Sequence, residues 1–134
     1  MTQSLPTAAT ERYVPDAEAA RALFAPIADK PREIAAFAYL DPEWRLLGVR
    51  HSMSGASDGV DAPIREVVSD VIAFGAAAVV MAHNHPSGDT APSAADFMIT
   101  RRLSQALQAV GVRLVDHLIV AGDQVSSLRN KGFL

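Results

Sequence analysis

The chain has 134 residues, of which 49% are hydrophobic, so it fits one domain with enough apolar material for a core. Its 12 basic and 15 acidic residues give a net charge of −3, which argues against the basic surface of a nucleic-acid-binding protein. The sequence has no cysteine, which excludes disulfides, thiolate metal sites and a cysteine nucleophile.

The hydropathy pattern and the first residues indicate the compartment. No apolar run reaches the roughly 18 residues of a membrane span, and the longest, at residues 71–82, is interrupted by Gly75. Residues 1–12 lack the basic start and the apolar stretch of a signal peptide. We therefore expect a cytoplasmic protein without membrane contact, with a flexible lead at residues 1–15 and one domain at residues 16–134.

The first part of the domain predicts a helix followed by a hairpin. Asp16 can cap a helix over residues 17–28, whose apolar residues share one face. Residues 33–40 are apolar almost throughout, as expected for a strand covered on both sides. A turn at residues 41–43 leads into a second strand over residues 44–50, so the two strands form a hairpin.

The second part of the domain alternates helices and strands. After a loop at residues 54–61, apolar residues at helical spacing predict a helix over residues 62–74. Residues 77–82 are apolar and β-branched, which indicates a buried strand. A loop at residues 83–92 and a long helix at residues 93–110 follow. Two further strands complete the domain, over residues 112–121 and 124–127.

The order of these elements defines the expected fold class. A helix, a hairpin, a helix, a strand, a helix and a strand pair are typical of an α/β domain with a mixed β-sheet flanked by helices. The histidine-containing loop leaves the C-terminal end of a central strand. Ligand sites of open α/β sheets tend to lie at such strand ends, so this loop is the expected place of the functional site.

Three residues around this loop have the pattern of a metal site. His83 and His85 are two positions apart, and side chains at that spacing point the same way in an extended segment. Asp96 lies in the first turn of the next helix, close to the loop. Two imidazoles and one carboxylate leave a fourth position for water, as in catalytic zinc sites.

Each part of this pattern also has a structural interpretation. A His-x-His pair alone is more often structural than metal-binding. Ser93 and Asp96 match a capping box, in which Ser93 begins the helix and Asp96 lies near the positive end of its dipole. The interpretations are compatible, because capping would hold Ser93 and Asp96 rigidly beside the loop.

The complete pattern of His-x-His, seven residues, Ser, two residues and Asp resembles the signature of the JAMM (MPN+, or JAB) metalloproteases. The segment at residues 82–96, AHNHPSGDTAPSAAD, is most similar to the bacterial RadC-like branch of that superfamily. Further similar segments at residues 31–41, 64–68 and 114–134 extend the resemblance over about residues 20–134. It implies the MPN fold, also called the JAB or cytidine-deaminase-like fold.

The resemblance also implies a reaction and a role for each motif residue. In the family, zinc is bound by the positions that match His83, His85 and Asp96, and it carries a water. The motif serine, here Ser93, stabilises the oxyanion of a tetrahedral intermediate, and an upstream glutamate takes the proton of the water. Zinc can lower the pKa of its water towards about 7. We therefore expect a zinc (Zn²⁺) metallohydrolase that cleaves an amide bond.

Two glutamates compete for the role of catalytic base. Glu33 begins the first predicted strand and matches the glutamate that precedes the same strand in RadC-like proteins. Glu66 lies on the helix at residues 62–74 beside Arg65, where a surface ion pair is the simpler role. Glu33 is therefore the predicted base. Of the remaining polar residues, Asn84 is expected to brace the backbone, and His117 to have a structural or supporting role rather than to bind metal.

Other functions stay open at this point. The main alternative is a catalytically silent MPN-type binding or scaffold protein associated with DNA repair or mobile elements. A non-haem iron oxygenase with two histidines and one carboxylate is a third. The expected partner is a peptide or protein substrate of unknown identity, and direct nucleic-acid binding is not expected from the charge. The apolar stripe at residues 93–110 suits either the core or the interface of a homodimer.

Overall fold

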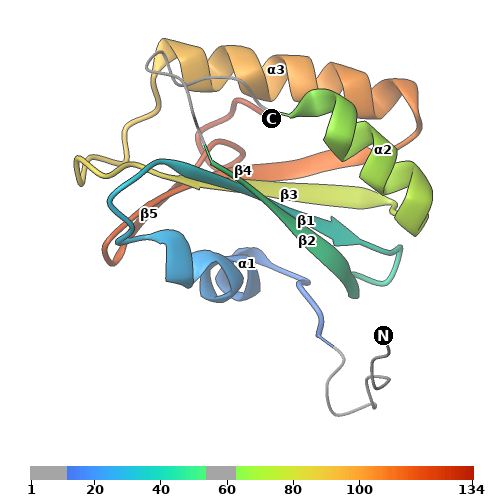
Figure 1. Cartoon of the computed structure of the whole chain (residues 1–134), viewed down its shortest axis with the longest axis horizontal. Helices are drawn as coiled ribbons and strands as arrows, with labels where there is room; N and C mark the ends of the chain where they lie inside the picture. The colour runs from blue at the N-terminus through green and yellow to red at the C-terminus, as the bar shows by residue number, and fades with distance from the viewer. Residues whose placement is uncertain (1–11, 54–62) are drawn as a thin grey trace.

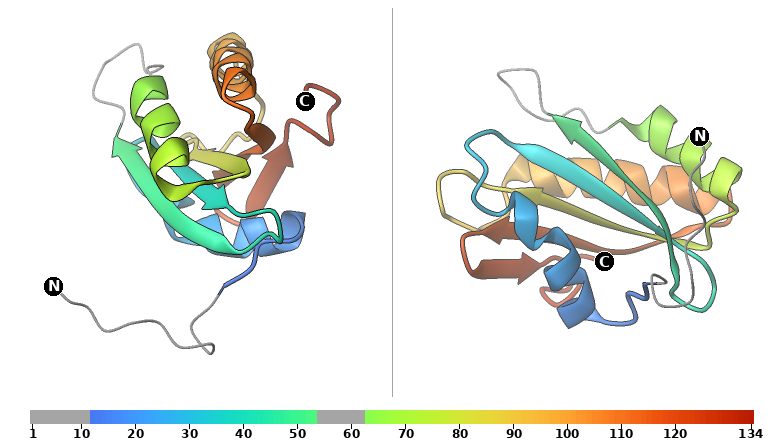
Figure 2. Two further views of the ribbon diagram at one scale, coloured as in Figure 1. Left: turned by 90° about the vertical axis from the view of Figure 1, so that its right-hand side faces the viewer. Right: turned by 60° about the horizontal axis from the view of Figure 1, so that its bottom comes forward.

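The computed structural model describes residues 12–53 and 63–134. They form one mixed β-sheet with helices on both faces, so the domain has three layers (Figure 1). Two helices, α2 and α3, cover one face, and α1 covers the other (Figure 2). The expected α/β class with a mixed sheet flanked by helices is therefore confirmed. None of the helices in the described ranges is long and apolar enough to cross a membrane.

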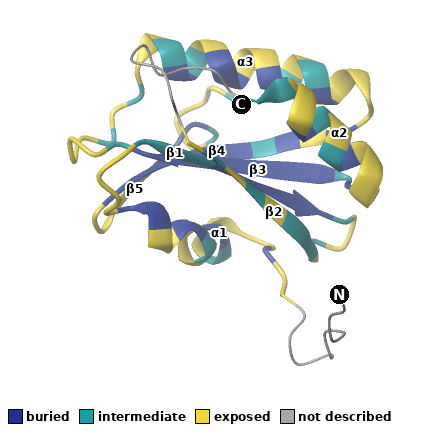
Figure 3. Ribbon diagram, in the orientation of Figure 1, coloured by how far each residue is buried: buried dark blue, intermediate teal, exposed yellow. Residues whose placement is uncertain are grey.

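β3 is the central strand of the sheet. Its strand order is β2-β1-β3-β4-β5, in which β3 and β4 are parallel and all other neighbours are antiparallel. Every residue of β3 is buried (Figure 3), because the strand has neighbours on both sides and helices on both faces. The strand bounds are β1 Ile34–Leu40, β2 Leu46–Met53, β3 Ala78–Asn84, β4 Arg113–Ala121 and β5 Gln124–Ser127.

Residue size distinguishes the two faces of the sheet. Along β1 and β3, the residues that face α1 are mostly small, whereas those that face α2 and α3 include Phe37, Tyr39 and Met81. Because successive strand side chains point to opposite faces, His83 continues the row of Met81 towards α3. Asn84 continues the opposite row, towards α1. The alternation therefore directs two consecutive polar residues to different layers of the domain.

The helices begin and end at recognisable signals. α1 (Ala17–Phe24) is capped by Asp16, which accepts a hydrogen bond from the Ala19 amide, as expected. It ends earlier than the expected residue 28, because Pro26 cannot donate and the chain tightens into a 3-10 turn, Ala25–Ile27. Gly75 ends α2 (Ile64–Phe74) with a φ of 67°. The last helix is α3 (Ala94–Ala109).

Several expected boundaries differ from the structure. β3 extends to Asn84, so His83 and Asn84 belong to the strand and not to the following loop. β2 begins at Leu46 and not at residue 44, because the Asp41 carboxylate accepts bonds from the amides of Glu43 and Arg45 and lengthens the turn.

The expected flexible lead and the first long loop are only partly covered. Residues 1–11 of the lead and the loop expected at residues 54–61 lie outside the described ranges. The described end of the lead is packed: Val14 is 3% exposed and its amide donates to the Trp44 carbonyl at 2.8 Å. Residues 12–15, the described end of the predicted lead, therefore contact the domain.

Candidate metal centre

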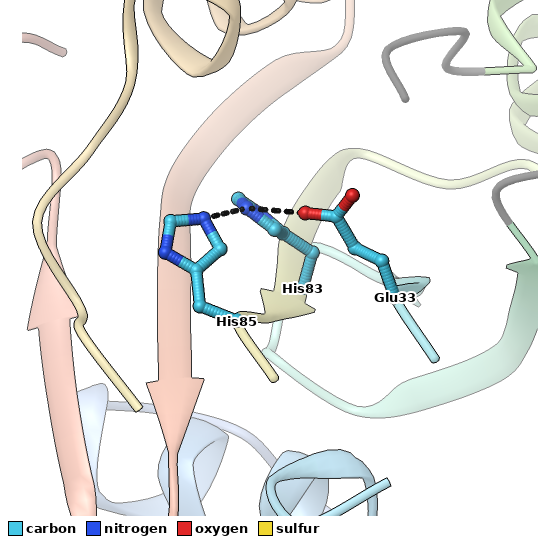
Figure 4. Close-up of side chains that lie close together, drawn as sticks. All are labelled: Glu33, His83 and His85. Carbon is cyan, nitrogen blue, oxygen red and sulfur yellow. Dashed lines mark hydrogen bonds and ion pairs between the residues drawn. The ribbon is translucent and has the colours of Figure 1, made fainter. Parts of the chain in front are cut away.

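The candidate site lies where β1 begins, β3 ends and α3 begins. Strands β1 and β3 are antiparallel, with Ala35 opposite His83. Glu33 lies two residues before Ala35 and His85 two residues after His83, so they come from adjacent segments and point to the same face as His83. Figure 4 shows these three side chains converging at the end of β3. One ligand atom from each lies within 4.8 Å of the others, a separation that suits one metal ion.

Asp96, in the first turn of α3, contacts both histidines. Its Oδ1 lies 3.2 Å from Nε2 of His83, and its Oδ2 lies 3.2 Å from Nε2 of His85. The two Nε2 atoms are 2.8 Å apart, and Oε2 of Glu33 is 3.7 Å from Nε2 of His83. The structure thus brings Glu33, His83, His85 and Asp96 together. Glu66 is an exposed residue in the first turn of α2, outside this group.

The capping box holds Asp96 in place. Ser93 Oγ accepts a hydrogen bond from the Asp96 amide at 3.0 Å, and Asp96 Oδ2 accepts one from the Ser93 amide at 2.8 Å. The capping-box interpretation is confirmed. The same bonds that begin α3 direct the Asp96 carboxylate at the histidines. Burial raises the pKa of Asp96, but the hydrogen bonds from His83 and Ser93 outweigh it and hold the pKa well below its usual range.

His85 has a fixed tautomer. Its Nδ1 lies 2.7 Å from the main-chain oxygen of Asp89. A carbonyl oxygen only accepts hydrogen bonds, so Nδ1 of His85 carries the hydrogen and donates it. In the neutral ring, Nε2 then presents a lone pair to His83 and Asp96. A main-chain carbonyl is a usual partner for the outer nitrogen of a metal-binding histidine.

Asn84 braces the segment that carries Glu33, as expected from its position between the histidines. Its side-chain oxygen accepts a hydrogen bond from the Ile34 amide at 2.6 Å. Its side-chain amide donates to the carbonyls of Lys30 and Arg32, at 3.2 and 2.9 Å. Asn84 is fully buried and holds the main chain on both sides of Glu33. One residue of β3 thereby fixes the position of the carboxylate relative to the two histidines.

His117 supports His83 and lies behind the group. Its Nε2 is 2.7 Å from Nδ1 of His83, and its Nδ1 is 2.5 Å from Oγ1 of Thr100. Burial, reinforced by the neighbouring charge of His83, lowers the pKa of His117 to about 3, so the ring is neutral under ordinary conditions. Thr100 was missed by the sequence interpretation. The sequence signal that could have identified Thr100 is its position one helical turn after Asp96, on the buried face of α3.

The chemistry of the group suits a divalent metal ion. Two imidazole nitrogens and two carboxylates converge within a few ångströms, and three of the four side chains are largely buried. Buried carboxylates need a cation or several donors nearby. Nitrogen and carboxylate ligands are those that zinc prefers when no thiolate is present. The residues therefore fit a zinc ion on chemical grounds.

The fold and the site define a class of protein, an α/β domain of the MPN (JAB) type with a potential metal site at the end of a central strand. Residues 14–133 match the model of the family described as RadC-like JAB domain. The chain belongs to the RadC-like JAB domain family. This confirms the resemblance and accounts for the arrangement of sheet and helices.

Individual relatives support the same assignment. The chain is 44% identical over 110 residues to a UPF0758 protein of Acidithiobacillus ferrooxidans, a match that covers 82% of this chain and 49% of the relative. It is 47% identical over 103 residues to UPF0758 protein YfjY of Escherichia coli, with 77% of this chain and 64% of the relative covered. The chain therefore spans about half to two thirds of the length of these relatives.

Proposed function

We propose that this protein is a zinc-dependent hydrolase of amide bonds, with His83, His85 and Asp96 as metal ligands. The observation that carries the proposal is the convergence of two imidazole nitrogens and the Asp96 carboxylate at separations of 2.8 to 3.2 Å. In addition, Oε2 of Glu33 lies 3.7 Å from Nε2 of His83, beside this group. Three protein ligands and one remaining position are the arrangement of catalytic zinc sites.

Exposure separates the proposed ligands from the proposed base. The side chains of His83, His85 and Asp96 are 6, 15 and 8% exposed, whereas that of Glu33 is 34% exposed. A general base must reach both the attacking water and the solvent with which it finally exchanges protons. Glu33 also lies further from the His83 nitrogen than Asp96 does, at 3.7 against 3.2 Å. These differences favour Glu33 as the base and Asp96 as the ligand.

Each proposed residue has one task in the reaction. A bound zinc ion would supply a Lewis acid that polarises the scissile carbonyl and acidifies a water molecule. Glu33 accepts one proton from that water as the oxygen attacks the amide carbon. Glu33 then returns the proton to the leaving amine, so that an acid and an amine are formed.

Ser93 is the proposed donor to the developing oxyanion. Its Oγ accepts a hydrogen bond from the Asp96 amide, so the hydroxyl hydrogen is available for a second partner. A donor held by a helix cap keeps its direction without reorganisation during the reaction, which makes it effective in stabilising charge. The family resemblance assigns the same task to this position.

The first experiment is metal analysis of the purified full chain, followed by assay against a library of internally quenched peptides. We expect about one zinc ion per chain in the wild type and none in His83→Ala. Glu33→Gln should retain zinc and lose hydrolysis, while the matched control Glu66→Gln should retain both. A wild type that binds no zinc would overturn the proposal. Zinc binding without cleavage of any peptide would favour the binding or scaffold function instead.

A further inference from the structure

We propose that the main-chain carbonyl of Asp96 sets the tautomer of His83 through two positioning residues, Thr100 and His117. The three links are short: Thr100 Oγ1 lies 2.7 Å from the Asp96 carbonyl oxygen, 2.5 Å from His117 Nδ1, and His117 Nε2 lies 2.7 Å from His83 Nδ1. The inference rests on the metal site proposed above and adds the device that prepares His83 for the ion.

The direction of the chain of hydrogen bonds follows from its first link. The carbonyl oxygen of Asp96 cannot donate, so the single hydroxyl hydrogen of Thr100 points to it. Thr100 Oγ1 then has no hydrogen left for His117 and must accept. Consequently Nδ1 of His117 carries a hydrogen and donates it to Thr100.

The hydrogen position on His117 determines that on His83. His117 is fully buried, which disfavours a charged ring. A neutral His117 with its hydrogen on Nδ1 has a bare Nε2, which can only accept. Its partner, Nδ1 of His83, must therefore carry a hydrogen and donate it. Nε2, the atom that faces His85 and Asp96, is then the only nitrogen of His83 that can bind a metal ion. The hydrogen on Nδ1 thus selects the ligand atom of His83 before any metal binds.

Burial keeps water out of this chain of bonds. As whole residues, main chain included, His117 is fully buried and Thr100, His83 and Asp96 are 2, 4 and 5% exposed. No buried side-chain nitrogen or oxygen in the described ranges lacks a hydrogen-bond partner, so no competing donor needs to be satisfied here. Without access to solvent, neither imidazole can exchange to the other tautomer by reversing a single bond. All three links would have to reverse together, and the Asp96 carbonyl forbids it.

An irregularity in the sheet brings His117 into this position. Val79 pairs with Leu114 and Val80 with Asp116, so Val115 is an extra residue in β4. Without it, strict alternation from Leu114 would turn His117 to the face of α1. With it, His117 pairs with Met81 and faces α3, where Thr100 lies. The chain of bonds therefore depends on a specific feature of the fold, and His117 is placed there by more than chance proximity.

The decisive experiment is nitrogen NMR of the histidine rings in the metal-free full chain. Long-range proton–nitrogen spectra of ¹⁵N-histidine-labelled protein distinguish the two tautomers of each ring. We expect His83 and His117 both to carry their hydrogen on Nδ1. A wild type in which His83 carries its hydrogen on Nε2 would overturn the proposal without any variant. Because no metal is present, this result does not depend on the proposed function.

Two variants of Thr100 then test the link to metal binding. Thr100→Val keeps the shape but removes the hydroxyl, and should mix the tautomers of His83 and weaken zinc affinity roughly 10- to 100-fold. Thr100→Ser keeps the hydroxyl and should restore both. The control is Ser127→Ala, which removes another buried hydroxyl, bonded to Asp116 at 2.6 Å, outside the chain of bonds.

The outcomes separate this proposal from a general loss of stability and from the proposed function. Equal zinc affinity in Thr100→Val and the wild type would overturn the positioning role, as would an equal loss in Ser127→Ala. If the wild type shows the expected tautomers but binds no zinc, the proposed function fails while the assignment of His83 stands.

Discussion

Two polar clusters lie on the same face of the sheet, and they differ in how their acceptors are matched. In one, the Asp70 carboxylate of α2 accepts hydrogen bonds from the Tyr39 hydroxyl at 2.6 Å and from the Arg50 guanidinium at 2.5 and 3.1 Å. In the other, the candidate metal site, carboxylates and imidazole nitrogens face one another. The first cluster includes the guanidinium of Arg50, whereas the second consists of two histidines and two carboxylates.

Both clusters contain a carboxyl group with a lowered pKa. The pKa of Asp70 and that of Asp96 both lie below the usual range of a carboxyl group. For Asp70 the main cause is the bond from Arg50, and this network is complete without any ligand. A lowered pKa alone therefore does not identify a site. The supply of hydrogen-bond donors to the carboxylate distinguishes the two clusters. Substitutions that change this supply in one cluster at a time test the difference.

The largest effect is expected from removing a metal ligand. His83→Ala should abolish zinc binding, because it leaves one imidazole and one carboxylate and also breaks the contact with His117. Elemental analysis after dialysis measures the remaining zinc. The matched change in the other cluster, Asp70→Asn, should leave the zinc content unchanged. Equal zinc content in His83→Ala and the wild type would show that the ion binds elsewhere.

The next effect is expected at Asn84, which joins the site to the main chain around Glu33. Asn84→Ala removes three hydrogen bonds and leaves buried partners unsatisfied, so it should lower the free energy of unfolding by about 2–4 kcal/mol. It should retain zinc yet lose most peptide hydrolysis, because Glu33 is no longer held. Urea denaturation and metal analysis of the same sample test both statements. Unchanged hydrolysis would contradict the bracing role.

A smaller effect is expected in the complete cluster. Asp70→Asn weakens the bonds from Arg50 and from the fully buried Tyr39. The Arg50 and Asp70 side chains are 36% and 19% exposed, so we expect a loss of only about 1–2 kcal/mol in unfolding free energy. Zinc affinity and hydrolysis should stay at the wild-type level. A clear fall in zinc affinity would mean that the two clusters are coupled through α2 and the sheet.

The smallest effect concerns the pH dependence of that loss. The folded pKa of Asp70 is below its unfolded value of about 3.9, so its stabilisation is present above that value and is lost as the pH falls through the folded pKa. The difference in unfolding free energy between the wild type and Asp70→Asn should therefore be largest near neutral pH and shrink below about pH 4. A difference that grows on acidification would contradict this assignment.

The sequence predicted which residues lie together in the candidate site and the general roles of Asn84 and His117, but not the partners of those two supporting residues. His83, His85 and Asp96 could be named because strand alternation and a helix cap are local rules that operate within a few residues. Glu33 required the family resemblance in addition, since its proximity depends on the register between β1 and β3. That register is set by packing over the whole sheet, which a local pattern does not contain.

The supports depend on contacts between distant segments. Asn84 bonds to residues 50 to 54 positions away, and Thr100 reaches His117 across 17 positions. The orientation of His117 also depends on the extra residue in β4, where the alternation rule fails. The end of α1 is a different case: the sequence contains Pro26, but the expected helix was continued past it. The partners of Asn84, Thr100 and His117 could not be predicted because they depend on long-range geometry. The end of α1 was predicted wrongly because the local signal of Pro26 was not applied.

The closed path from Asp96 through Thr100 and His117 to His83 has a mechanical consequence. One end of α3 is connected to the sheet by the contacts of Asp96 with His83 and His85 and by the hydrogen-bonded bridge through Thr100. The rest of the helix packs on the sheet through the fully buried Leu103 and Leu107. A small rotation of α3 would move Asp96 and Thr100 together and disturb both contacts of His83 at once. The geometry of the candidate site thus depends on how one helix packs on the sheet, and changes far along that helix can reach it.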